Sequence, residues 1–118
     1  QERSDLFQVL ALVEVKNVTL LDGDRLRFPD AVSERGRKHL DLLLAAVRLG
    51  LRGVILFAAN RPEADRVGPA WEIDPAYGRR LLEAVEGGVE ALAVRLVHGT
   101  EGIDVGDLLP VDLAPPGG

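Results

Sequence analysis

The chain has 118 residues, enough for one domain but not for two, because domains usually contain roughly 100 to 200 residues. Its composition, 47% hydrophobic and 28% charged, excludes an intrinsically disordered protein, and no apolar run approaches the roughly 18 residues that span a membrane. The absence of cysteine excludes disulfides and cysteine-zinc sites, and the net charge of −5 opposes indiscriminate binding to nucleic-acid phosphates or anionic membranes.

The first half of the chain predicts a strand, a turn, a helix and a second strand. Residues 6–20 are rich in Val, Leu and Thr and alternate in polarity near their middle, which is typical of a half-buried strand. Residues 22–24, with the sequence Asp-Gly-Asp, are typical of a turn. Ser33 is a suitable N-cap for a helix with apolar residues at helical spacing, and Gly50 is suited to end it. The continuous apolar run 53–59 predicts a central strand covered on both faces.

The second half predicts a loop, a helix and the remaining strands. Residues 60–73 are expected to form the loop. Asp74 provides an N-cap, and Pro75 fits the first turn of a helix that ends at residues 87–88, which are both glycine. Further strands are expected at residues 89–97, 103–105 and 109–113. Strands interleaved with helices in this order predict a mixed α/β fold in a single domain.

Two aromatic residues in this half are expected to be structural. Trp71 and Tyr77 are the only tryptophan and tyrosine of the chain. Two such side chains do not make a platform on which nucleic-acid bases stack, so we expect them to pack the second helix. Asp30 and His98 lie in predicted turns, where a structural role is the more common one.

Basic residues gather in one stretch of the chain. Between residues 25 and 39 there are five basic and two acidic residues, so nucleic acid would most readily be bound there. Within the stretch, Arg35, Lys38 and His39 are three and four positions apart, which places them along one face of the predicted helix. Contact with phosphate and a solvated helix face are both open interpretations of this pattern.

A possible chemical site lies in the first strand. Residues two positions apart share a face of a strand, so Glu14 and Lys16 project together. A carboxylate beside an ammonium can hold a divalent cation and stabilise negative charge on a phosphate, although an ordinary cross-strand ion pair is the more common meaning of this spacing alone. Magnesium would need a further oxygen ligand, for which Asp5 is the upstream candidate.

Longer motifs identify a family that the chain resembles. They are residues 13–20 (VEVKNVTL), 28–32 (FPDAV), 34–40 (ERGRKHL), 61–62 (RP), 69–70 (PA), 72–77 (EIDPAY), 88–93 (GVEALA) and 109–113 (LPVDL). In this order and spacing they closely resemble the sugar fermentation stimulation protein (SfsA) family over nearly the whole chain.

The resemblance implies a fold and an activity. The fold would be restriction-endonuclease-like, of the PD-(D/E)xK type, with a mixed β-sheet flanked by helices. The activity would be that of a nuclease dependent on magnesium or manganese, with nonspecific nucleic-acid binding and a link to maltose and other sugar metabolism. Glu14 and Lys16 match the (D/E)xK pair, and Asp5 is the best match to the preceding catalytic aspartate. The metal ligands would then be Asp5, Glu14 and the backbone carbonyl of Val15.

The position of Asp5 raises a geometric question. If residues 5–14 formed one extended strand, its two ends would lie about 30 Å apart, at about 3.3 Å per residue, and could not share a metal. Either a tight turn lies near residues 8–10, where the sequence has no typical turn residue, or the aspartate of the site is not Asp5.

The resemblance also implies domain boundaries within the chain. Residues 1–113 would form the C-terminal nuclease-like domain, and residues 114–118 are expected to be a disordered tail. The family also has an N-terminal OB-like domain, a common platform for nucleic acid, which we expect to be missing from these 118 residues. A sequence that starts at Gln1 without a leader is expected to be a fragment or a processed product rather than a secretory precursor.

Two hypotheses for the function follow. The first is a cytoplasmic, metal-dependent nuclease domain that hydrolyses DNA or RNA, with Arg35, Lys38 and His39 holding the nucleic-acid backbone. The second is a noncatalytic, nonspecific DNA-binding or regulatory module linked to sugar metabolism. Neither requires a membrane, and analogy with nucleases that cut both strands leaves a homodimer open.

Overall fold

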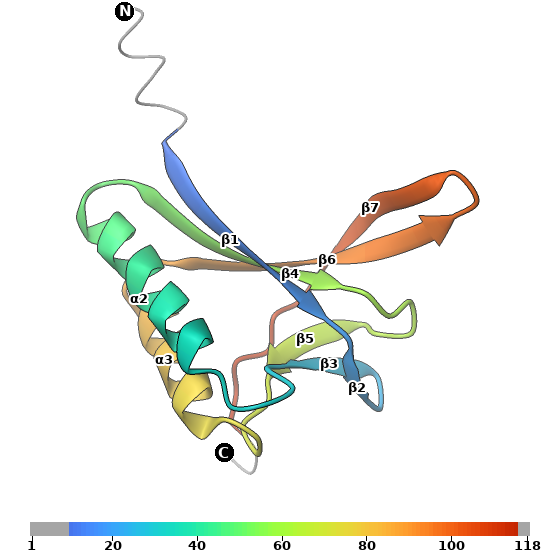
Figure 1. Ribbon diagram of the computed structural model, residues 1–118, viewed down its shortest axis with the longest axis horizontal. Helices are drawn as coiled ribbons and strands as arrows, with labels where there is room; N and C mark the ends of the chain where they lie inside the picture. Colours follow the sequence, from blue (N-terminus) through green and yellow to red (C-terminus); the bar gives the residue numbers. More distant parts are fainter. Residues whose placement is uncertain (1–9, 116–118) are drawn as a thin grey trace, which may run out of the picture.

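The computed structural model describes residues 10–115, which form a mixed α/β fold of seven strands and two helices. In chain order the elements are β1 (Ala11–Val18), β2 (Leu20–Asp22), β3 (Arg25–Phe28), α2 (Glu34–Arg48), β4 (Arg52–Ala59), β5 (Arg66–Pro69), α3 (Pro75–Glu86), β6 (Glu90–Gly99) and β7 (Gly102–Leu109). Figure 1 shows both helices on one side of the molecule and the β6–β7 hairpin extending away from them.

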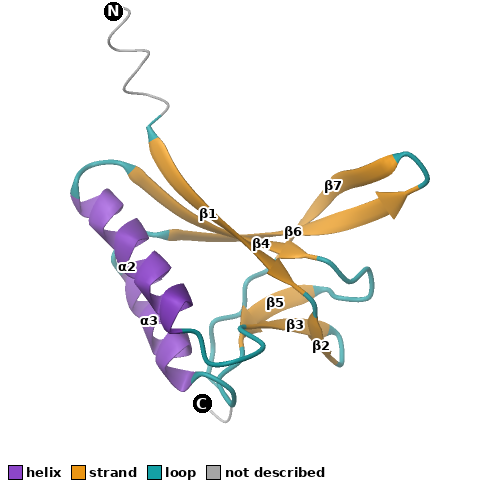
Figure 2. Ribbon diagram, in the orientation of Figure 1, coloured by secondary structure: helices purple, strands orange, loops and turns teal. Residues whose placement is uncertain are grey.

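The larger sheet has the strand order β1-β4-β6-β7. The first three strands are parallel, and β7 returns antiparallel to β6 (Figure 2). The predicted central strand is confirmed, because β4 lies between β1 and β6, and Ile55 and Phe57 are buried. The strand alternation predicted for the first segment is also confirmed, since Val13 and Val15 are exposed while Val18, on the other face, is buried.

A second sheet of three short strands, in the order β2-β3-β5, was not predicted from the sequence. The expected turn at residues 22–24 joins β2 to β3, as Asp22 pairs with Arg25. The expected loop at residues 60–73 contains β5, which pairs in parallel with β3. Each of these two strands has only four residues, and each contributes one fully buried side chain, Leu26 and Val67. So short a segment carries too little periodicity to be recognised.

The end of the chain also differs from expectation. The two short strands predicted at residues 103–105 and 109–113 are replaced by one continuous strand, β7, followed by a single bridge between Val111 and Val67. A shift of register between Val94 and Leu96 lets the β6–β7 ladder continue across the position of Gly106. Of the predicted disordered tail, residues 116–118 lie outside the described residues.

The core lies between the helices and the two sheets. Leu40 and Leu43 of α2 and Leu81 of α3 pack with Phe57 and other buried residues of the sheets. Tyr77 has no exposed surface, which confirms that it packs the second helix. Trp71 joins it there: a Cβ atom added to Gly78 would come within 2.6 Å of the Trp71 ring, so the two are in close contact.

Both predicted helix starts are confirmed, and a single carboxylate connects them. Ser33 caps α2 by accepting a hydrogen bond from the Gly36 N–H at 2.8 Å. Asp74 caps α3 by accepting from the Tyr77 N–H at 3.0 Å. The same Asp74 side chain accepts from the Ser33 N–H at 2.8 Å and pairs with Arg37 at 3.2 Å, so it ties the start of α2 to the start of α3.

The predicted end of the first helix is confirmed as well. Gly50 follows the C-cap residue Leu49 and has a φ of +88°, a left-handed conformation that favours glycine. Neither helix of the described chain is long and apolar enough to cross a membrane.

Replacing Asp74 with alanine is expected to lower the free energy of unfolding by about 2 to 4 kcal/mol, because a buried N–H group, a partly buried N–H group and a guanidinium lose their acceptor. Urea denaturation followed by circular dichroism measures this. Asp30→Ala is the matched control: this carboxylate is exposed and forms no ion pair within residues 10–115, so the change should stay within about 0.5 kcal/mol. Equal losses in the two variants would contradict the role given to Asp74.

The stability of the fold should also depend on pH through Asp74. Burial acts to raise the pKa of this carboxyl, but the hydrogen bonds from Ser33 and Tyr77 and the charge of Arg37 outweigh it, so the pKa lies below its ordinary 3.8. Asp74 therefore binds its proton more readily in the unfolded chain. Its contribution is complete above about pH 5 and is lost as the pH falls through 4 toward the folded pKa.

Urea denaturation between about pH 2.5 and 6 tests this linkage. Asp74→Asn removes the titrating group, so the free energy of unfolding of the variant should fall less steeply with decreasing pH below about 4 than that of the wild type. Two parallel curves would show that Asp74 is not the source of the slope.

Candidate functional site

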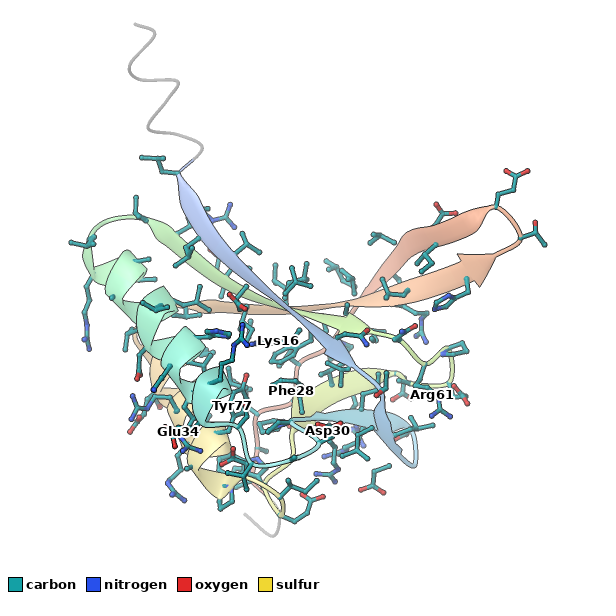
Figure 3. The ribbon with its side chains drawn as sticks, viewed as in Figure 1. Lys16, Phe28, Asp30, Glu34, Arg61 and Tyr77 are labelled. Carbon is teal, nitrogen blue, oxygen red and sulfur yellow. The ribbon has the colours of Figure 1, made fainter. Side chains whose placement is uncertain are left out.

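Glu14 and Lys16 project from β1 toward the helix layer. The Lys16 Nζ atom lies 3.5 Å from Glu14 Oε1, which confirms that the two side chains share a face of the strand. Figure 3 shows the Lys16 side chain between β1 and α2. Helix α2 brings His39 to the same place: its Nδ1 atom lies 2.6 Å from Lys16 Nζ and 3.2 Å from Glu14 Oε1. The structure therefore groups a carboxylate, an ammonium and an imidazole.

The three side chains of this cluster are partly withdrawn from solvent. The exposed fraction is 13% for the Lys16 side chain, 19% for His39 and 35% for Glu14. Partial burial strengthens the attraction between Lys16 and Glu14 relative to a surface ion pair, because fewer water molecules screen it. The Glu14 side chain is the most exposed of the three, so it is the most accessible to a further ligand.

Only part of the predicted basic face of α2 lies near the cluster. Arg35, one turn before His39, places its Nε atom 3.5 Å from His39 Nε2, so Arg35 borders the cluster to which His39 belongs. Lys38 does not join them: it is largely exposed and lies 3.7 Å from Glu34 on its own helix. Because successive helix residues are rotated by about 100°, Lys38 faces a different direction from His39.

The metal ligands predicted from the sequence are described only in part. Asp5 lies outside the described residues, so the question of its distance from Glu14 stays open. The Val15 side chain is exposed on the opposite face of β1, so only its backbone carbonyl could take part. Within residues 10–115, no three histidine or acidic side chains gather closely enough to hold a metal ion, and Glu14 is the one carboxylate of the cluster.

Tyr77 was predicted to be structural, and the structure adds an electrostatic connection to the site. Burial raises the pKa of its phenol, and the negative charges of Asp74 and Glu14 raise it further. Its hydroxyl is buried and has no hydrogen-bond partner within the described part of the chain. The sequence contained no signal for this, because α3 is brought next to α2 only by tertiary packing, with a Cβ atom on Gly36 placed 3.2 Å from the Tyr77 ring.

The side chains of the cluster indicate which kinds of ligand the site could bind. The Glu14 carboxylate is a hard oxygen donor of the kind that magnesium or calcium prefers, and its partners here are an ammonium and an imidazole rather than a bidentate guanidinium. Lys16 and Arg35 supply positive charge on the same side. A cation held at one or two carboxylates usually keeps water and substrate phosphate in its remaining positions, and within the described residues Glu14 is the one carboxylate of the cluster that could act in this way.

Comparison with known proteins gives consistent results. The family model described as "Sugar fermentation stimulation protein RE domain" matches residues 2–102. A sugar fermentation stimulation protein homolog of Pelobacter propionicus is 55% identical over 101 residues, covering 86% of this chain and 44% of the relative. The homolog of Geobacter sulfurreducens is 54% identical over 99 residues, covering 84% of this chain and 43% of the relative.

A solved structure agrees with these relatives. The structure of Pyrococcus furiosus SfsA in complex with Ca2+ has a TM-score of 0.80 and 33% sequence identity, and covers 86% of this chain and 45% of that one. The chain thus spans less than half the length of the relatives that it matches. Since the family model matches most of its residues, the chain belongs to the sugar fermentation stimulation protein (SfsA) family.

Proposed function

We propose that this chain is a metal-dependent nuclease domain with a restriction-endonuclease-like fold, which hydrolyses phosphodiester bonds in DNA or RNA. The observation that carries the proposal is the pairing of Glu14 with the partly buried Lys16 on the helix-covered face of β1. This pair differs from an ordinary surface ion pair, because His39 contacts both of its residues. The match to a family model described as an RE domain supports the same fold.

Divalent-cation binding is the second part of the proposal. Glu14, the backbone carbonyl of Val15 and Asp5, which lies outside the described residues, would hold magnesium or manganese. The related Pyrococcus furiosus protein has been solved in complex with Ca2+, another hard cation with a preference for oxygen ligands, which supports this choice. When bound, such a cation polarises a phosphoryl oxygen and lowers the pKa of a water molecule that attacks phosphorus.

The chain's own residues would act on the substrate by charge and position. Lys16, held 2.6 Å from His39, places its ammonium where it stabilises the negative charge that develops on the phosphate oxygens. Arg35 and His39 would contact the nucleic-acid backbone beside it. Lys38 would contribute only to the general attraction of phosphate, because it lies outside the cluster.

Calorimetric titration with Mg2+ and with Mn2+ tests the cation site. Glu14→Gln keeps the size of the side chain but removes its charge, so metal affinity should fall by roughly 10- to 100-fold or disappear. The matched control is Glu34→Gln, an exposed carboxylate on α2 that pairs only with Lys38 within the described residues and should leave binding unchanged. Unchanged binding in Glu14→Gln would refute the assignment of Glu14 as a ligand.

Cleavage assays test the activity itself. With DNA and RNA substrates and either metal, Lys16→Ala is expected to lower the rate by roughly 100-fold or more, since a preorganised positive charge next to the phosphate is lost. Lys38→Ala should change the rate by less than about threefold. Wild-type protein that binds nucleic acid with a steep salt dependence but cuts neither substrate would instead support the noncatalytic DNA-binding or regulatory module.

A further inference from the structure

Within residues 10–115, the four-stranded sheet is covered on one face. Gly53, Ile55 and Phe57 of β4 project toward the helices. A Cβ atom on Gly53 would lie 2.6 Å from the backbone oxygen of Leu43 in α2, and Ile55 and Phe57 are buried. Figure 2 shows both helices and the small sheet on this side of the larger sheet, and no helix or strand of the described chain over the other side.

The uncovered face is apolar across all four strands. The register pairs Val15 of β1 with Leu56 of β4, and Leu56 with Leu92 of β6. Two residues further along β6, and so on the same face, Val94 pairs with Leu108 of β7. These side chains alternate with the buried residues that face the helices, so the strands have apolar residues on both faces.

Several apolar side chains of the uncovered face are in contact with solvent. Four of them are between 38% and 67% exposed: Val13, Val15, Leu92 and Leu108. Parallel strands such as β1, β4 and β6 are usually covered on both faces, and a contiguous apolar patch of more than a few hundred Å2 usually marks an interaction site. The uncovered face therefore has the character of an interface.

The charged residues on this face neutralise each other. Along β1, β4 and the part of β6 that pairs with β4, they are Arg52 and Glu90. The Arg52 guanidinium donates two hydrogen bonds to the Glu90 carboxylate, at 2.7 and 2.9 Å. The chain as a whole has a net charge of −5, so most of its surface would repel a second copy. The uncovered face can meet an identical face without that repulsion.

The face is also large enough for a specific contact. Four strands about 4.8 Å apart, each of at least eight residues at about 3.3 Å per residue, outline an area of about 500 Å2. Two such faces together give about 1,000 Å2, which is the size at which specific protein–protein interfaces begin. Apolar sheet faces pack on each other in this way in β-sandwiches.

We propose that the uncovered face of the β1-β4-β6-β7 sheet binds a second copy of this chain, and that the two sheets pack face to face in a two-fold symmetric dimer. A two-fold contact uses the same surface of both copies, as a neutral apolar face allows. Leu92, on one of the two central strands, lies inside this contact. The cluster of Glu14, Lys16 and His39 lies on the opposite, helix-covered face, so it stays open in the dimer.

Sedimentation equilibrium on the wild-type chain tests the dimer. The apparent mass should rise with concentration from 12.7 kDa to twice that value and no further, with a dissociation constant on the order of 10 µM for a contact of this size. A mass of 12.7 kDa at every concentration would overturn the proposal. The face would then be left for another part of a longer polypeptide, since the relatives are more than twice as long as the matched region.

Charged substitutions test which surface forms the contact. Leu92→Glu would bury a carboxylate without a partner in each copy, so the dissociation constant should rise by roughly 100-fold or more. Leu108→Glu lies on the edge strand β7, where a charge is well tolerated in the monomer, and should also weaken the dimer by at least about tenfold. The matched control is Leu42→Glu on α2, 59% exposed, which should change the constant less than about twofold.

Urea denaturation followed by circular dichroism shows whether each variant is still folded. If folded Leu92→Glu and Leu108→Glu proteins dimerise like the wild type, the contact lies elsewhere, for instance along the outer edge of β7, and the proposal is overturned.

Alkylation of single cysteines provides an independent readout, because the chain has no cysteine of its own. In Leu108→Cys, the rate of reaction with a maleimide should fall about tenfold at a concentration where about nine-tenths of the chains are dimeric. Leu42→Cys should react at one rate throughout. Equal behaviour of the two thiols in a dimeric protein would contradict the proposed face. Neither metal nor nucleic acid is needed, so these results are independent of the proposed nuclease activity.

Discussion

The position of the helix layer depends on the buried carboxylate of Asp74. It accepts hydrogen bonds from the backbone of Ser33 and of Tyr77, the first at the cap of α2 and the second in the first turn of α3, and it pairs with Arg37. One side chain thereby fixes both helix starts relative to each other. A shift of α2 by one residue would turn His39 by about 100° about the helix axis, away from Lys16. The cluster on β1 is thus held in part by a residue that does not belong to it.

Two periodicities meet at the cluster. The period of two in β1 directs Glu14 and Lys16 toward α2, and it sends the apolar Val13 and Val15 to the opposite face. The helical period then decides which basic residue of α2 meets them. His39 belongs to the cluster and Arg35, one turn earlier, borders it, whereas Lys38, one residue before His39, is paired with Glu34.

Features determined by neighbouring residues could be predicted from the sequence. The caps at Ser33 and Asp74, the buried strand β4 and the shared face of Glu14 and Lys16 all follow from local preferences. Features that depend on distant pairing could not. The strands β3 and β5 have four residues each and are stabilised by pairing with each other, and the contact between Asp74 and Ser33 joins residues 41 positions apart. That His39 rather than Lys38 contacts Glu14 and Lys16 likewise depends on where β1 lies relative to α2, which local preferences do not determine.

The ion pairs of the described residues show that most arginines of this chain, whose net charge is −5, already lie beside a carboxylate. Within the described residues, eight arginines lie next to carboxylates of the same chain: Arg25, Arg27, Arg37, Arg52, Arg61, Arg66, Arg80 and Arg95. Their charges are largely neutralised in place, so they contribute little to the field away from the surface.

Arg35 differs from those arginines, because within the described residues it forms no ion pair with a carboxylate and its Nε–H group donates instead to His39 Nε2 at 3.5 Å. Beside it, Lys16 shares the single carboxylate of Glu14 with His39. The divalent cation that we propose on Glu14 would offset the charge of that carboxylate and leave Lys16 less compensated, which would raise the attraction of Lys16 and Arg35 for phosphate. Because the net charge of the chain is −5, the proposed attraction for phosphate would have to act locally, at these residues, against the charge of the chain as a whole.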